Sequence, residues 1–139
     1  MSAVQVQHYL GRARDFLKGM DFLKEDLAGY RYSAALLAIH GAISYCDALR
    51  IGLGSQNLSS ENHQAASGEL KILLSARNIK NSGGVDRLSR LLEMKSKIAY
   101  SSYLSSESDI KQIVLRAERF AAWAEATGKE LKIQGWGND

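Results

Sequence analysis

Two titratable side chains interrupt the most apolar stretch of this chain, residues 32–49. His40 and Asp47 are seven residues apart, so in a helix they share one face and lie about 10 Å apart along its axis. Ser33 and Ser44 fall near the same line. A buried polar group without a partner costs roughly 1–3 kcal/mol, so these side chains need partners. They predict either a purely structural pairing with a neighbouring helix or the polar floor of a cleft that binds a ligand.

Basic and phenolic groups that could complete such a cleft occur in the segment 95–100. Lys95 shares a helical stripe with apolar residues, so its stem should point inward while its ammonium group reaches water. Lys97 and Tyr100 are three residues apart and form one ridge. If this helix lies beside the apolar one, a cationic cleft above a carboxylate results, which suits a phosphate-bearing ligand. The structural alternative is that Lys95 pairs with Asp47 and has no further role.

The residue spacing gives little indication of a metal-binding site or of a catalytic nucleophile. The three histidines, His8, His40 and His63, fall on three different segments, and no paired Cys or His spacing supplies adjacent ligands. The single Cys46 lies in an apolar stripe, which is typical of a packing residue. We therefore expect no metal, no cofactor and no catalytic residue.

The net charge of the chain is +3, which alone does not indicate a nucleic-acid partner. The charge is unevenly distributed, because residues 71–100 carry seven basic and only two acidic side chains. One interpretation is a solvated helix face beside a basic loop. The other is a surface that attracts phosphates or an RNA backbone. The basic residues are Lys71, Arg77, Lys80, Arg87, Arg90, Lys95 and Lys97.

The elements that position these groups show apolar periodicity divided by clusters of Gly, Ser and Asn. Residues 32–49 are apolar on two faces, which predicts a central helix packed on both sides. No segment alternates as a strand would, and the absence of Pro suits long helices. We predict an all-α fold, a four- to five-helix up-and-down antiparallel bundle, with helices at about residues 4–26, 30–52, 61–77, 86–100 and 106–128.

Length and composition narrow the class of protein. A length of 139 residues predicts one domain, which we assign to residues 1–132, followed by a flexible tail at 133–139. We read no secretory signal at the start, and no apolar run approaches the roughly 20 residues that cross a bilayer. The single Cys46 fits a reducing compartment. These features predict a cytoplasmic protein that does not bind a membrane.

Taken in order, several motifs resemble the HEPN superfamily, small helical bundles of bacteria and archaea often encoded beside nucleotidyltransferases or in defence loci. The resemblance covers about Tyr30 to Glu125. It rests on residues 35–49, His63 at the start of the next helix, Leu91-Leu92, residues 95–100 and residues 117–120.

The ribonucleases of this family carry an Arg, four to six residues and then a His near the end of the bundle. Here that place holds Lys95 and Tyr100, so both diagnostic residues are replaced. A tyrosine, with a pKa near 10, is a poor general base at neutral pH, and a lysine lacks the arginine fork. Asp47 matches the acidic or polar position of the preceding core helix, so the resemblance implies a retained pocket without the reaction.

We therefore expect a non-catalytic HEPN-like domain that binds a nucleotide, an RNA phosphate or a companion protein. Its candidate ligand-binding residues are His40, Asp47, Lys95, Lys97 and Tyr100. Two alternatives stay open. One is a ribonuclease toxin with an atypical Lys/Tyr site and an antitoxin partner, and the other is the partner subunit of a nucleotidyltransferase.

The small residues of the central helix bear on assembly. Ala34, Ala38, Gly41 and Ala42 would permit another helix to approach closely. A symmetric pair of such helices is the usual closed arrangement of two identical chains. The sequence therefore predicts a homodimer with a helix-on-helix interface.

Overall fold

The computed structural model describes residues 2–56, 58, 62–80, 83–100 and 106–137 of the chain. Over these residues the chain forms five α-helices and one 3-10 turn, and no strand, which confirms the all-α prediction. The elements are α1 (Ser2–Leu23), η1 (Lys24–Asp26), α2 (Leu27–Gly52), α3 (His63–Ala76), α4 (Gly84–Tyr100) and α5 (Glu107–Glu130).

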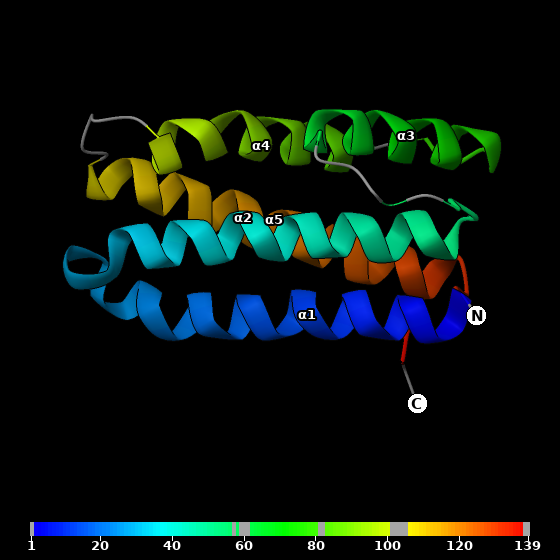
Figure 1. Cartoon of the computed structure of the whole chain (residues 1–139), viewed down its shortest axis with the longest axis horizontal. Helices are drawn as coiled ribbons and strands as arrows, with labels where there is room; N and C mark the ends of the chain where they lie inside the picture. Colours follow the sequence, from blue (N-terminus) through cyan, green and yellow to red (C-terminus); the bar gives the residue numbers. More distant parts are fainter. Residues whose placement is uncertain (1, 57, 59–61, 81–82, 101–105, 138–139) are drawn as a thin grey trace.

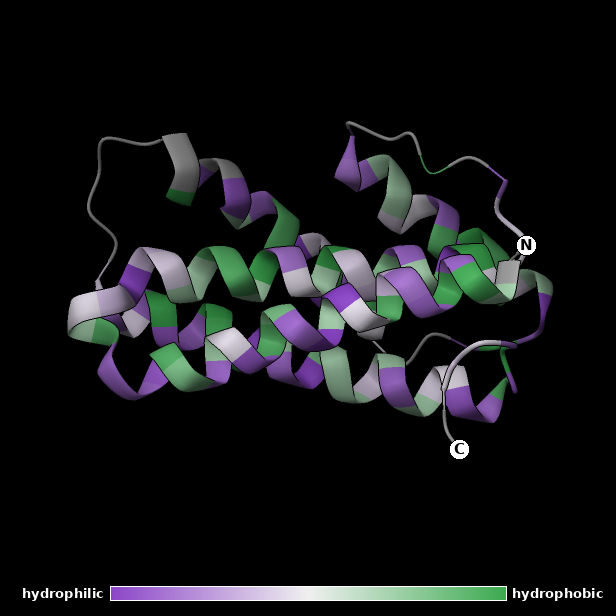
Figure 2. Ribbon diagram, turned by 60° about the horizontal axis from the view of Figure 1, so that its bottom comes forward, coloured by the Kyte–Doolittle hydropathy of each residue, from purple (hydrophilic) through white to green (hydrophobic). Residues whose placement is uncertain are grey.

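The long helices α1, α2 and α5 form three sides of the bundle, and the shorter helices α3 and α4 together form the fourth (Figure 1). α1 and α2 run in opposite directions, and α5 runs in the same direction as α2. α3 and α4 follow one another along the remaining side, an arrangement that Figure 2 shows from a second direction. This α3/α4 side is the layer that carries the basic segment of the sequence.

Local capping interactions determine where several helices begin. The Asp26 carboxylate accepts a hydrogen bond from the backbone N–H of Gly29 at the start of α2. The Asn62 side chain caps α3 in the same way and accepts hydrogen bonds from the backbone N–H groups of Gln64 and Ala65. Ser106 and Asp109 form a reciprocal capping box at the start of α5. Each cap satisfies backbone donors that the first helical turn leaves without partners.

α2 is the central helix, because α1, α3, α4 and α5 all pack against it. Ala35, Ile39 and Leu49 on α2 are completely buried. Tyr32 is exposed, because it lies near the corner where the backbone leaves helical geometry at Tyr30. The prediction of a central helix packed on both faces is confirmed.

The small residues of α2 serve packing within the chain. Ala34, Ala38 and Ala42 are buried, and a Cβ atom at Gly41 would lie 1.8 Å from the Leu17 side chain of α1. These residues cannot form the interface that we predicted for a homodimer, because one chain already covers them. The placement of that interface is therefore wrong, while dimerisation itself stays a prediction.

The C-terminal segment also differs from its prediction. Trp136 is only 1% exposed, and its Nε1–H donates to Glu125 Oε1 at 3.2 Å. Gly128 makes room for the indole, because a Cβ atom there would lie 2.0 Å from the ring. Ile133 is buried as well, against Gly52 of α2. The predicted flexible tail is therefore wrong for residues 133–137, which pack onto the bundle and extend the domain past residue 132.

One stretch within Ala3–Gly52 has the length and apolar composition that a membrane-crossing helix needs, although we predicted no such run. Most of its apolar window, 78%, is buried within the bundle. Burial in a protein core selects the same residues as burial in lipid, so this composition is weak support for a membrane span.

Candidate functional site

The polar line of α2 contains three charged or titratable side chains. His40 is half-buried, and its ring lies 6.1 Å from the ring of Phe16 on α1. Asp47 is also half-buried and accepts a hydrogen bond from Arg50 Nη1 at 3.0 Å. Arg50 itself is only 4% exposed. The line therefore holds a buried ion pair at one end and an imidazole near its middle.

Arg50 is the residue that sequence reasoning missed. Its Nε donates to Glu69 Oε1 of α3 at 2.6 Å, and the Ser55 hydroxyl donates to the same oxygen at 2.8 Å. Asp47 therefore pairs with Arg50, three residues later on its own helix. The predicted pairing of Asp47 with Lys95 is wrong, since no such contact is found among the described residues. The i,i+3 spacing of Asp47 and Arg50 was the signal that could have found this pair.

Burial and nearby charges shift the pKa of the Asp47 carboxyl group in opposite directions. Burial raises the pKa of its carboxyl group, while the nearby guanidinium groups of Arg50 and Arg12 act in the opposite direction. Burial dominates because a carboxylate loses most of its hydration when it leaves water. Lys95 is not among the charges that influence this group. Asp47 and Arg50 together form a structural pair beneath the surface.

Three other groups lie on three helices, α2, α3 and α4, that pack against one another. The charge of Lys95 on α4 reaches both His40 on α2 and His63 on α3. Burial is the main cause that lowers the pKa of each imidazole, and the Lys95 ammonium group lowers both further. Arg12 of α1 adds to the effect on His40. We call His40, His63 and Lys95 the cationic strip.

The space beside His63, the one residue of the cationic strip that lines it, is small. A crevice too narrow to admit a water molecule lies between α2, α3 and α4. Burial raises the pKa of the Cys46 thiol in its wall, so this cysteine is a packing residue and not a nucleophile. Its other lining residues are Ile43, Asp47, His63, Ala66, Leu88 and Leu92. A ligand can therefore meet the cationic strip only from outside.

The structure places the five predicted site residues in different surroundings. The structure places His40 and Lys95 within electrostatic reach of each other, and it adds His63. Asp47 belongs to the ion pair with Arg50, and Lys97 is exposed on α4. Tyr100 closes α4, but its side chain lies outside the described residues. Within the described ranges, no three His, Cys, Asp or Glu side chains are grouped as a metal site would require.

No family model, no curated protein and no solved structure matches this chain.

Proposed function

We propose that this chain is a non-catalytic HEPN-like binding domain that takes a phosphate-bearing ligand, a nucleotide or an RNA phosphate, at the cationic strip. The proposal rests on the packing of α2, α3 and α4 against one another together with the electrostatic effect of Lys95 on His40 and His63. At neutral pH the positive charge of this site comes from Lys95, while the two imidazoles, whose pKa values are lowered, are neutral and supply hydrogen-bonding groups beside it.

The charge of Lys95 is available to such a ligand. Lys95 forms no ion pair with any residue that the structure describes, whereas the carboxylates of Asp47 and Glu69 are both engaged by Arg50. A lysine is a compact point charge that binds phosphate well, and imidazole N–H groups can donate to the remaining phosphate oxygens. The narrow crevice beneath favours a surface-bound phosphate over an enclosed substrate.

The same site supports a second candidate, a ribonuclease, on one observation. Imidazoles with a lowered pKa are neutral near pH 7 and could accept a proton from an RNA 2′-hydroxyl. The binding domain is preferred because Lys95 and Tyr100 stand in place of the Arg and His of the family's nucleases. Cys46 and Asp47, the other reactive groups nearby, are buried or paired.

The test is a calorimetric titration of the protein at low salt with ATP and with a short oligouridine. We expect Lys95→Ala to weaken both interactions about tenfold, equivalent to ~1.4 kcal/mol. Lys97→Ala is the matched control, because Lys97 is an exposed lysine two residues later on the same helix. Equal losses for the two variants, or no binding by the wild type, would contradict the proposal.

Incubation of the purified protein with the oligouridine separates the two candidates. We expect intact RNA after prolonged incubation. Cleavage that disappears in His40→Gln or His63→Gln would replace the binding domain with the ribonuclease.

A further inference from the structure

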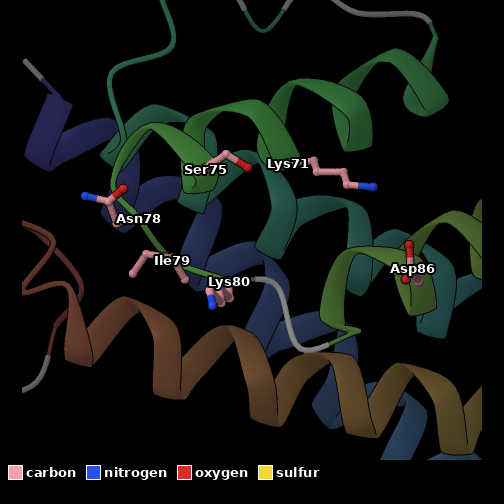
Figure 3. A pocket seen from close by; sticks show the side chains of 6 residues that line it. All are labelled: Lys71, Ser75, Asn78, Ile79, Lys80 and Asp86. Carbon is pink, nitrogen blue, oxygen red and sulfur yellow. The ribbon is translucent and has the colours of Figure 1, made fainter.

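Exposed cations of this protein differ in whether they face a common point. At the open hollow of about 490 Å³ between α3 and α4, Figure 3 shows the Lys71 side chain extending toward the side of Asp86 and away from Lys80. The two lysines of this hollow are therefore directed apart. Two other cations, one on α1 and one on α4, do share a neighbour, the His40 imidazole of the cationic strip.

The cation on α1 is Arg12, which is exposed and lies beside two aromatic rings. Its guanidinium carbon is 6.0 Å from the centroid of the Tyr9 ring and 5.8 Å from that of the Phe16 ring. A guanidinium group at this distance from an aromatic ring is attracted to it. The Phe16 ring lies in turn 6.1 Å from the His40 ring. These contacts place Arg12 next to the cationic strip, on the side that α1 forms.

The cation on α4 is Lys95, and neither it nor Arg12 forms an ion pair with a residue that the structure describes. Burial is the main cause that lowers the pKa of the His40 imidazole, and the Lys95 ammonium and Arg12 guanidinium groups lower it further. The charge of Arg12 also reaches Asp47, but Arg50 already engages that carboxylate. An anion is therefore the partner that these two cations lack.

The two cations belong to helices on either side of α2. α1 and α4 each pack against α2, which lies between them in Figure 1. The axes of packed helices are about 8–10 Å apart, and two such steps separate α1 from α4. One phosphate group is too small to contact both cations while the Arg12 guanidinium stays against its aromatic rings. Two linked phosphates could extend from one cation to the other across His40.

We propose that Arg12 is a second phosphate-binding residue of this site and that the ligand carries two or more linked phosphates. Lys95 binds one phosphate, and Arg12 donates from its guanidinium N–H groups to the next. The inference rests on the proposed function, because it adds a second contact to the same ligand. A nucleoside diphosphate and two successive phosphates of an RNA strand share this chemistry.

The test is a ¹⁵N NMR titration of the whole chain at low salt with three uridine probes: UMP, UDP and 5′-phosphorylated diuridine. UMP offers one phosphate, whereas each of the other two offers two. We expect at least one of these two to bind about tenfold more tightly than UMP, with shifts near residues 12, 40 and 95. A preference for UDP identifies a polyphosphate chain, and a preference for the diuridine identifies an RNA backbone.

Variants of Arg12 test its role. Arg12→Gln should remove most of the tenfold advantage and change the affinity for UMP by less than about twofold. Retained UMP binding also shows that the variant is folded. Arg12→Lys keeps the charge and should retain part of the advantage. Arg119→Gln is the matched control, because Arg119 is an exposed arginine of α5, and it should change none of the three affinities.

Three outcomes would overturn the second phosphate contact. They are equal binding of all three probes by the wild type, an equal loss of UMP and of the two-phosphate probes in Arg12→Gln, and equal effects of Arg12→Gln and Arg119→Gln.

The second contact and the proposed function can fail separately. Lys95→Ala should weaken all three probes, because each of them places a phosphate on Lys95. Lys95-dependent binding of UMP without any advantage for the two-phosphate probes would refute the role of Arg12 alone. Binding of every probe without dependence on Lys95 would refute the proposed function.

Discussion

Charged side chains on the two sides of the bundle have different surroundings. Arg14 of α1 donates two hydrogen bonds of 2.8 Å to Glu125 of α5, and Lys24 of η1 contacts Glu118 of α5 at 2.6 Å. On the α3/α4 side, Lys71, Lys80 and Lys95 form no ion pair with described residues. The first set of charges joins helices, whereas the second faces solvent and is available to a ligand.

Glu125 shows how complete the pairing is on the first side. It accepts from Arg14, from the Tyr45 hydroxyl at 2.7 Å and from the Trp136 indole. Burial alone would raise the pKa of this carboxyl group, but the hydrogen bonds from these three donors lower it below its ordinary value. A carboxylate with several donors is stable in its charged form even when half-buried. This network ties α1, α2, α5 and the C-terminal segment together.

The largest effect should follow from breaking that network at Trp136. Trp136→Ala removes a fully buried aromatic side chain and should lower the free energy of unfolding by about 3–5 kcal/mol. Trp136→Phe is the control, because it keeps most of the ring and loses only the hydrogen bond to Glu125. Urea unfolding followed by circular dichroism measures both variants. A loss under ~1 kcal/mol for Trp136→Ala would mean that the paired side does not depend on its C-terminal segment.

A smaller effect on stability should come from the histidines of the cationic strip. The pKa values of His40 and His63 are lowered in the folded protein, so the unfolded chain binds more protons as the pH falls below about 6.5. Their contribution to stability is therefore present above that pH and is lost as the pH falls toward their folded pKa values. We expect a lower urea midpoint at pH 5.5 than at pH 7.5.

The double variant His40→Gln, His63→Gln tests the origin of this loss. Its urea midpoint should change less between the two pH values than that of the wild type. His8→Gln, which replaces an exposed histidine, should leave the wild-type difference intact. Identical pH dependence of the wild type and the double variant would assign the effect to other groups.

The comparison also shows what periodicity can and cannot predict. The central helix was predictable because its two apolar faces are a local pattern, and burial of Ile39 and Leu49 follows from it. The packing of Trp136 was not predictable, because it depends on the space that Gly128 leaves for the indole ring and on a hydrogen bond to Glu125. Nothing in the spacing of the last residues indicates either partner, so the segment resembled a mobile tail.

The candidate site was predictable in its residue types but not in its pairings. Lys95 was the one partner considered for Asp47, whereas the actual partner is Arg50, three residues later on the same helix. The convergence of His63 on Lys95 depends on how α3 and α4 share one side, which no local pattern encodes. The excess of basic residues at 71–100 was visible in the sequence, but their placement in the fold was not.

The smallest effects should come from single lysines and should separate the two sides most directly. Lys24→Ala removes a lysine that contacts Glu118 and Asp21, and it should cost up to about 1 kcal/mol, as for other partly exposed ion pairs. Lys80→Ala removes a lysine without a described partner, and stability should change by less than about 0.5 kcal/mol. Added salt should reduce the cost of Lys24→Ala and leave Lys80→Ala unaffected, because only the former loses an attraction that salt screens. Urea unfolding at low and high salt measures all four values. Equal losses in the two variants would show that the division between paired and available charges has no energetic basis.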